Sequence, residues 1–335
     1  MPVLDPKALL EDRVRAIREY HQRAGIDRAE LDVSGGIDSG VMIQLIARAL
    51  GPDKVTAVYS GIHSSTASRE RARLAATAAG VALVELELGP IFDSVVDELK
   101  RGLAAAGYDM EEIETRCRAQ PLVLGSLRSC FRAPLGRGLN RMTGGGIRHG
   151  TGNECEDRWL RFYQKGGDGE VDSNPIAMLS KGEVYQLAVV AGVPRELIDA
   201  LPTPDLHGVG EAHNDEDELR ELTGVAWTYS RVDADTGEYR VVGTIERMSR
   251  FLDREEAAPL FADAEPDAAS MAAMTTAARE QFPGLSDDEL AAFLRSARRM
   301  ERVTRHKWNP NCPSLGERAP LVAAGVLSDT LPDAG

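Results

Sequence analysis

Residues 29–39 read Ala-Glu-Leu-Asp-Val-Ser-Gly-Gly-Ile-Asp-Ser and join a short strand to a helix through a glycine turn. Residues 29–33 predict the strand, and the paired glycines that follow predict a tight turn. From Asp38 to Leu50 apolar residues recur at helical spacing, and Gly51-Pro52 ends that pattern. The segment therefore predicts a strand–turn–helix unit.

Further strands and helices alternate outward from this unit. Their predicted ranges are strands at 55–59, 81–88 and 147–149 and helices at 67–79, 93–106 and 181–191. The last strong helix begins with a capping box from Ser286 to Glu289. Strands that alternate with helices predict an α/β fold, with a parallel sheet flanked by helices and joined by right-handed crossovers.

The overall charge limits the partners of this protein. The 335 residues include 39 basic and 53 acidic side chains, giving a net charge of −14, and the pI is about 5.0. This balance argues against a protein that neutralises a long phosphate backbone, so we expect no nucleic-acid partner. No apolar run approaches the roughly 20 residues of a membrane span, and the N-terminus lacks a signal-peptide pattern. We therefore expect a cytoplasmic protein with no membrane partner, whose four cysteines stay reduced.

The glycine turn at residues 34–39 carries the chemical signal. Its glycines permit close backbone approach, and the helix N-terminus behind them presents free amides to an anion such as phosphate. The lysine of the usual P-loop is missing, and no G-x-G-x-x-G pattern follows a strand. Asp38 would repel a phosphate unless a cation lay between them, so the turn predicts a magnesium nucleotide. The alternative is a strand-to-helix turn capped by Ser and Asp.

These residues resemble the PP-loop of the ATP pyrophosphatases, which split ATP into AMP and pyrophosphate while activating a substrate oxygen as an adenylate. That superfamily includes GMP synthetase, asparagine synthetase, tRNA-modifying thiolases and NAD synthetase. The rest of the chain is similar to NAD synthetase over most of residues 15 to 310. The similar segments, in order, are Gly150-Thr151-Gly152-Asn153-Glu154-Cys155-Glu156, Gln164-Lys165-Gly166-Gly167-Asp168, Asp172 with Pro175, Leu179-Ser180-Lys181, Pro202-Thr203-Pro204-Asp205-Leu206 and His306-Lys307.

The resemblance implies a PP-loop fold and an ammonia-dependent NAD synthetase. This ligase would convert deamido-NAD, ATP and ammonia into NAD, AMP and diphosphate through an acyl adenylate. Asp38 and Lys181 would be catalytic, and Asp38 and Glu156 would hold Mg²⁺. The implied ATP-binding residues are Ser34, Gly35, Gly36, Ile37, Asp38, Ser39, Thr151, Lys181 and Thr203. The implied substrate-binding residues are Arg132, Lys165, Asp168, Asp172, His306 and Lys307.

The chain departs from the family pattern on the side of the acid substrate. Within 128–138, Pro134, Gly136 and Gly138 oppose a regular helix, and Arg132 is the predicted pocket arginine. Gly166 and Trp308 replace a family tyrosine and arginine, and the Glu156–Lys165 spacing is one residue longer. A relative that adenylates and amidates a different small carboxylate is therefore an open alternative. A tRNA-modifying sulfur-transfer enzyme and a nucleotide-sensing module without turnover are weaker ones.

The organisation of the chain is predicted as follows. Residues 1–335 form a single domain with a core at about 15–310, a mobile segment at 253–267 and a peripheral tail at 321–335. The acidic cluster 211–221 is expected to be a solvated region, and these segments with His306-Lys307 are candidates for a closing cover. Fewer than 30 residues precede the first strand, so we expect free ammonia or ammonia from a separate amidotransferase. The resemblance also implies a homodimer.

Overall fold

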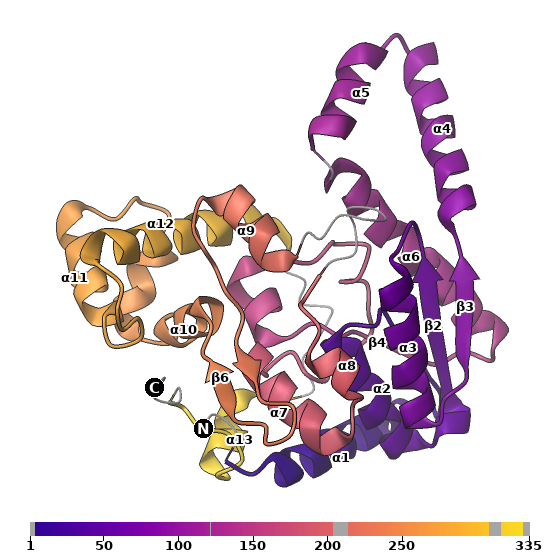
Figure 1. The fold of residues 1–335 in the computed structure, drawn as a ribbon, viewed down its shortest axis with the longest axis horizontal. Helices are drawn as coiled ribbons and strands as arrows, with labels where there is room; N and C mark the ends of the chain where they lie inside the picture. Colours follow the sequence, from indigo (N-terminus) through magenta and orange to yellow (C-terminus); the bar gives the residue numbers. More distant parts are fainter. Residues whose placement is uncertain (1–3, 121, 204–213, 308–315, 331–335) are drawn as a thin grey trace.

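The computed structural model describes residues 4–120, 122–203, 214–307 and 316–330. Its centre is a four-stranded parallel sheet in the order β3-β2-β1-β4 (Figure 1). The strands are β1 (Ala29–Asp32), β2 (Val55–Gly61), β3 (Leu83–Glu87) and β4 (Ile147–His149). All four lie where the sequence predicted a strand, so the predicted parallel α/β sheet is confirmed.

Helix α2 (Ile37–Leu50) is the central helix of the molecule. It follows β1 directly and packs against α1 (Pro6–Ala24), α3 (Thr66–Ala79) and α7 (Lys181–Ala191). Because neighbours surround it, α2 is apolar on almost every face, with Val41, Leu45 and Ile46 fully buried. The first hydrophobic core therefore runs from the sheet through α2 to α1 and α7.

Three helices connect β3 to β4. They are α4 (Gly89–Ala105), α5 (Met110–Ala119) and α6 (Leu122–Met142), and Figure 1 shows α4 and α5 projecting away from the sheet. The prediction that 128–138 resists a regular helix was wrong, because α6 continues through Pro134. Pro134 itself is exposed, whereas Phe131 and Leu135 pack against the third apolar cluster. Tertiary packing therefore overrides the local cost of proline.

Some of the remaining elements build a second core, and the others join the first. In the second core the ring of Trp227 contacts the rings of both Trp159 and Phe293. The elements after β4 and outside those already named are η2 (Glu156–Leu160), α8 (Arg195–Ile198), α9 (Asp215–Thr223), β5 (Arg231–Val232), β6 (Tyr239–Val241), α10 (Thr244–Phe251), η3 (Glu255–Leu260), α11 (Ala268–Ala278), α12 (Asp287–Thr304), η4 (Arg305–Lys307) and α13 (Arg318–Ala323). A 3₁₀ turn, η1 (Pro52–Lys54), precedes β2.

The acidic region is not simply a solvated face. Residues 211–213 lie outside the described part of the chain, but Asp215 and Glu218 are buried on helix α9. That expectation was wrong for these two carboxyl groups, because α9 packs one of its faces inward and carries Leu219 into the second core.

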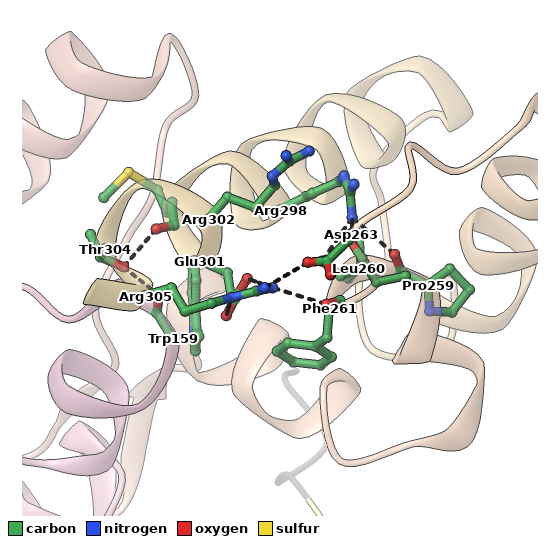
Figure 2. A network of polar contacts seen from close by, with 12 residues as sticks. Trp159, Pro259, Leu260, Phe261, Asp263, Arg298, Glu301, Arg302, Thr304 and Arg305 are labelled. Carbon is green, nitrogen blue, oxygen red and sulfur yellow. Dashed lines mark hydrogen bonds and ion pairs between the residues drawn. The ribbon is translucent and has the colours of Figure 1, made fainter. Parts of the chain in front are cut away.

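The segment 253–267 is anchored by three arginines, Arg298 and Arg302 of helix α12 and Arg305 directly after it (Figure 2). Arg298 donates hydrogen bonds to the carbonyl oxygens of Pro259, Leu260, Ala262 and Ala264 at 2.8–3.1 Å. Its Nε also donates to Glu265 at 3.0 Å. Mobility of this segment stays a prediction, and any such motion would have to break these bonds.

The C-terminal stretch contributes to the first core. Leu321 and Leu327, expected in a peripheral tail, are both buried there. Residues 331–335 of that tail lie outside the described part of the chain. Among the described helices, none has the length and apolar character needed to cross a membrane.

Gly136 is required by the contact between α6 and the sheet. A Cβ at Gly136 would lie 2.2 Å from Arg148 Nη1 and 2.9 Å from Glu30 Oε1, whereas a Cβ at Gly138 would meet nothing within 4 Å. Arg148 is buried and paired with Glu30 and Asp32, so it has little room to move.

We predict that Gly136→Ala lowers the free energy of unfolding by about 1–3 kcal/mol through overpacking. Gly138→Ala on the same helix should raise it by about 0.5–1 kcal/mol through helix propensity. Urea unfolding of both variants measures the difference. Equal effects at the two positions would contradict the assigned role of Gly136.

Candidate active site

The predicted phosphate-binding turn lies between the end of β1 and the first turn of α2. Gly35 has a φ of +85°, and a Cβ there would lie 2.2 Å from the carbonyl oxygen of Ser68. Ser39 Oγ donates to the Gly36 carbonyl at 3.0 Å and lies 3.3 Å from Ser34 Oγ. No side chain caps α2 within the described residues, so its first amides are open to an anion, as predicted.

Three charged side chains from three elements meet beside this turn. Lys181 Nζ lies 2.7 Å from Asp38 Oδ2 and 2.7 Å from Glu156 Oε1. Lys181 is the first residue of α7, Asp38 belongs to the first turn of α2, and Glu156 begins η2. The structure thus brings together the two predicted catalytic residues and both predicted metal ligands.

The turn after β4 aligns Asp38 with Glu156. Asn153 Nδ2 donates to Asp38 Oδ1 at 3.1 Å, and Asn153 Oδ1 accepts from the Glu156 amide at 3.2 Å. Residues 156–160 form a single π-helical turn, and such turns recur at functional sites. Asn153 therefore acts as a spacer between the two carboxylates.

Burial makes the charges of this cluster depend on one another. Lys181 is 3% exposed. Desolvation alone would lower its pKa, but Asp38 and Glu156 raise the pKa well above the usual value for lysine. Burial raises the pKa of Glu156, and Lys181 opposes that rise. The cation thus stays charged only because both carboxylates face it.

A further acid and two phenols surround the same cluster. Burial, followed by the charge of Glu156, raises the pKa of Asp215 to about 8. Lys181 Nζ lies 5.2 Å from the centre of the Tyr229 ring. Asp215 Oδ1 and the hydroxyls of Tyr185 and Tyr229 are buried without a hydrogen-bond partner among the described residues. Sequence reasoning missed these three residues because no motif marks them.

Two other predicted ATP-binding residues, Thr151 and Thr203, lie in loops. Thr151 is half-buried in the turn between β4 and Asn153. Thr203 is exposed and directly precedes residues 204–213, which are not described. Arg71 of α3, which the sequence analysis missed, donates to the Gly35 carbonyl at 2.9 Å and so fixes the turn from its other side.

One group of predicted substrate residues lies beside η2. Asp168 accepts from Ser129 Oγ at 2.7 Å, and its charge acts on both Asp157 and Lys307. Lys307 Nζ donates to the carbonyl oxygens of Arg161 and Tyr163, and burial lowers its pKa. Lys165 and His306, the other two members of this group, are exposed.

Asp172 lies in a different place, in a groove of about 580 Å³ that is lined by residues 24–27, which precede β1, and by residues 144–147 at the amino end of β4. Arg137 Nη2 lies 3.3 Å from Asp172 Oδ1, and Tyr20 OH donates to the Asp172 carbonyl at 3.1 Å. Arg132, the predicted pocket arginine, instead donates to the Ser60 carbonyl at the end of β2. Arg137 and Arg141, also on α6, are the arginines that line the groove.

Two buried histidines support the turn that carries Thr151 and Asn153. His21 Nε2 and His149 Nε2 are 2.9 Å apart, and His149 Nδ1 lies 2.6 Å from Ser173 Oγ. Burial, followed by the proximity of His21, lowers the pKa of His149 to about 3. His149 is the last residue of β4, so the neutral imidazole is part of the buried structure that supports the turn.

This histidine makes stability sensitive to acid. Since the folded-state pKa lies below the unfolded value of 6.5, the unfolded chain binds the extra proton first, and stability falls as pH drops from 6.5 towards 3. We predict that His149→Gln reduces this loss by about 3–5 kcal/mol over that range. Urea unfolding at several pH values measures it. His63→Gln, at a half-exposed histidine, should leave the slope unchanged, and equal slopes for all three proteins would contradict the prediction.

The pattern of site residues matches a known family. The family model described as NAD synthase matches residues 9–234. The NH(3)-dependent NAD(+) synthetase of Alkaliphilus oremlandii is 32% identical over 215 residues, covering 63% of this chain and 79% of that protein.

Solved structures agree in fold. The NMN synthetase of Francisella tularensis superposes with a TM-score of 0.57 at 19% identity, covering 83% of this chain and 94% of the other. A glutamine-dependent NAD(+) synthetase from Cytophaga hutchinsonii superposes with a TM-score of 0.59 at 15% identity, covering 91% of this chain and 50% of that one. These structures show a shared fold, whereas the family model, which matches about two thirds of the chain and includes Asp38, Glu156 and Lys181, shows that the chain belongs to the NAD synthase family.

Proposed function

We propose that this protein is an ammonia-dependent NAD synthetase, a ligase that converts deamido-NAD, ATP and ammonia into NAD, AMP and diphosphate. The observation that carries the proposal is the meeting of Lys181 with Asp38 and Glu156 beside an uncapped helix N-terminus. Family membership and the names of the curated relatives support the same reaction. They give no support to a different carboxylate substrate.

The reaction needs positioning and charge compensation rather than a protein nucleophile. A carboxylate oxygen of the acid attacks the α-phosphorus of ATP, and pyrophosphate leaves with the electrons of the broken bond. The first amides of α2, with Ser34 and Ser39 at the turn, would bind the leaving phosphates, and the uncapped start of this helix supports that role. Lys181 supplies a buried positive charge where negative charge develops. Ammonia then attacks the acyl carbon, and AMP leaves.

Mg²⁺ fits the carboxylates of this site. Asp38 and Glu156 each turn one oxygen towards the Lys181 ammonium, so the site already holds two carboxylates that face a positive charge. Within the described residues, no group of three or more His, Cys, Asp or Glu side chains could hold a metal. One or two carboxylates plus substrate phosphates is the ligand set that Mg²⁺ prefers. Asp38 and Glu156 would hold the ion, which would neutralise charge on the phosphates.

The groove at Asp172 is our candidate for binding part of the dinucleotide. The Arg137 guanidinium suits a phosphate, and the ring of Tyr20 offers an apolar surface for a base. The group around Asp168 and Lys307, beside η2, is our candidate for contacting the reacting carboxylate end of the acid substrate. Free ammonia or a separate amidotransferase would supply the nitrogen, and a homodimer in the cytoplasm is the setting that we propose.

Product analysis by mass spectrometry tests the reaction. With Mg-ATP, ammonium and deamido-NAD, we predict NAD and AMP in equal amounts. Lys181→Met should lower kcat by about 100-fold or more, because it removes a buried charge that acts on the transition state. Lys54→Met is the matched control, since Lys54 forms an exposed ion pair with Asp27. AMP without NAD, or full activity of Lys181→Met, would contradict the proposal.

Steady-state kinetics of two arginine variants test the groove. Arg137→Met should raise the KM for deamido-NAD by about 10-fold and leave the KM for ATP unchanged, because one phosphate contact is worth about 1.5–3 kcal/mol. Arg132→Met should not raise the KM for deamido-NAD, since Arg132 faces the end of β2. The reverse result would restore Arg132 as the pocket arginine.

A further inference from the structure

The N-terminus of helix α7 lies inside a buried polar network that comes largely from beyond the segment matched by the family model. That segment ends at residue 234, whereas Glu246, Arg250 and Arg318 all follow it. Ser180, the N-cap of α7, is fully buried and directly precedes Lys181. The network therefore acts on the residue next to the site lysine.

One side of the network is a carboxylate that binds the N-cap. Ser180 Oγ donates to Glu246 Oε1 at 2.7 Å, and Tyr239 OH donates to the same oxygen at 3.0 Å. Ser230 Oγ donates to the other oxygen of Glu246. A Cβ on Gly182 would lie 2.0 Å from the Tyr239 hydroxyl, so the phenol sits directly against the backbone of the first turn.

The other side is a carboxylate held by two arginines. Glu183 is fully buried, and its Oε2 accepts from the Ser180 amide at 2.8 Å. Arg318 donates to both of its oxygens at 2.7 Å, and Arg250 Nη2 donates to Oε1 at 3.1 Å. Burial alone would raise the pKa of Glu183, but the two guanidiniums hold the pKa below its usual value. Such bidentate pairs fix geometry as well as charge.

Arg318 ties this arrangement to the C-terminal stretch. Its Nη2 also donates to the Ser328 carbonyl at 2.6 Å, and Leu321 of the same helix is buried in the first core. The backbone on each side of Lys181 is thus fixed through Ser180 and Glu183. A shift of about 1 Å in a reacting group can cost 100-fold in rate, so this fixation bears on catalysis.

We propose that Arg318 is a positioning residue for Lys181: with Arg250 and Glu246, it holds the first turn of α7 so that the ammonium meets Asp38 and Glu156. The catalytic consequence rests on the proposed function, because it assumes that Lys181 acts on ATP. The structural part of the proposal, that Arg318 holds this turn, does not depend on the reaction.

The test compares Arg318→Met and Arg318→Lys with Arg195→Met in the full-length protein. Arg195 is an exposed arginine of α8, 56% exposed, that pairs with Asp199 and Asp235, so it is a matched control. Two quantities are measured: kcat with the KM for ATP, and amide hydrogen exchange of residues 181–184. Exchange reports local opening without any turnover.

We expect Arg318→Met to lower kcat by about 10- to 100-fold, with less than about a 3-fold change in the KM for ATP. Exchange at 181–184 should accelerate by about 10-fold while exchange in β1 and β2 stays unchanged. Arg318→Lys, which keeps the charge but loses the bidentate geometry, should recover part of the loss in kcat. Arg195→Met should match the wild type in both measurements.

Other outcomes are equally informative. If wild-type protein makes no NAD, the proposed function fails while the exchange measurement still decides whether Arg318 holds the turn. Unchanged exchange at 181–184 in Arg318→Met overturns the positioning role, as does faster exchange with unchanged kcat. If Arg318→Met does not fold, Arg318→Lys and Glu246→Gln replace it. Both should then lower kcat without raising the KM for ATP, and unchanged kcat in both would overturn the proposal.

Discussion

The Lys181 ammonium, buried between two carboxylates, is the interaction on which the site depends. Removing an ammonium ion from water costs several kcal/mol, and only close opposite charges offset that cost. Asp38 and Glu156 supply them from two other elements, each 2.7 Å away. Loss of any one of the three leaves an uncompensated buried charge or a repelling pair. The same three residues therefore hold α2, η2 and α7 together at the proposed active site.

The strand order explains why these elements meet. From β1 the chain moves to β2 and then β3 on one side, and it returns to place β4 on the other side of β1. The turns after β1 and β4 are consequently neighbours at the carboxyl ends of the strands. Such a switch point is where open α/β sheets bind ligands. Asp38 follows β1 and Glu156 follows β4, so the topology places both carboxylates at that crevice.

The sequence predicted the features that are encoded locally. Apolar runs located all four strands, and the glycine turn located the start of α2 within about a residue. The sequence did not predict features that depend on contacts between distant parts of the chain. Gly136 reads as a helix breaker until the Arg148–Glu30 pair behind it is known. The burial of Asp215 cannot be read from an acidic run, because composition does not say which face of a helix packs inward.

For the same reason, the sequence predicted only part of the candidate site. More than a hundred residues separate Asp38 from Glu156, so only the family resemblance joined them before the structure did. Arg132 and Arg137 lie on different faces of the same helix. The irregular sequence of residues 128–138 does not indicate which of these faces lines the groove. The roles in ligand binding assigned to the residues around Asp168 and Lys307 stay predictions.

The pairing of Glu183 with Arg250 and Arg318 limits how this chain can be recombined. A chimera that joins residues 9–234 to a C-terminal part without arginines at the positions of Arg250 and Arg318 would keep a fully buried carboxylate and lose both cations that compensate it. Breaking a buried pair in this way typically costs about 3–5 kcal/mol, a large share of the stability of a domain. The segment matched by the family model is therefore not a self-sufficient unit in this protein, because its buried Glu183 depends on two cations from outside that segment.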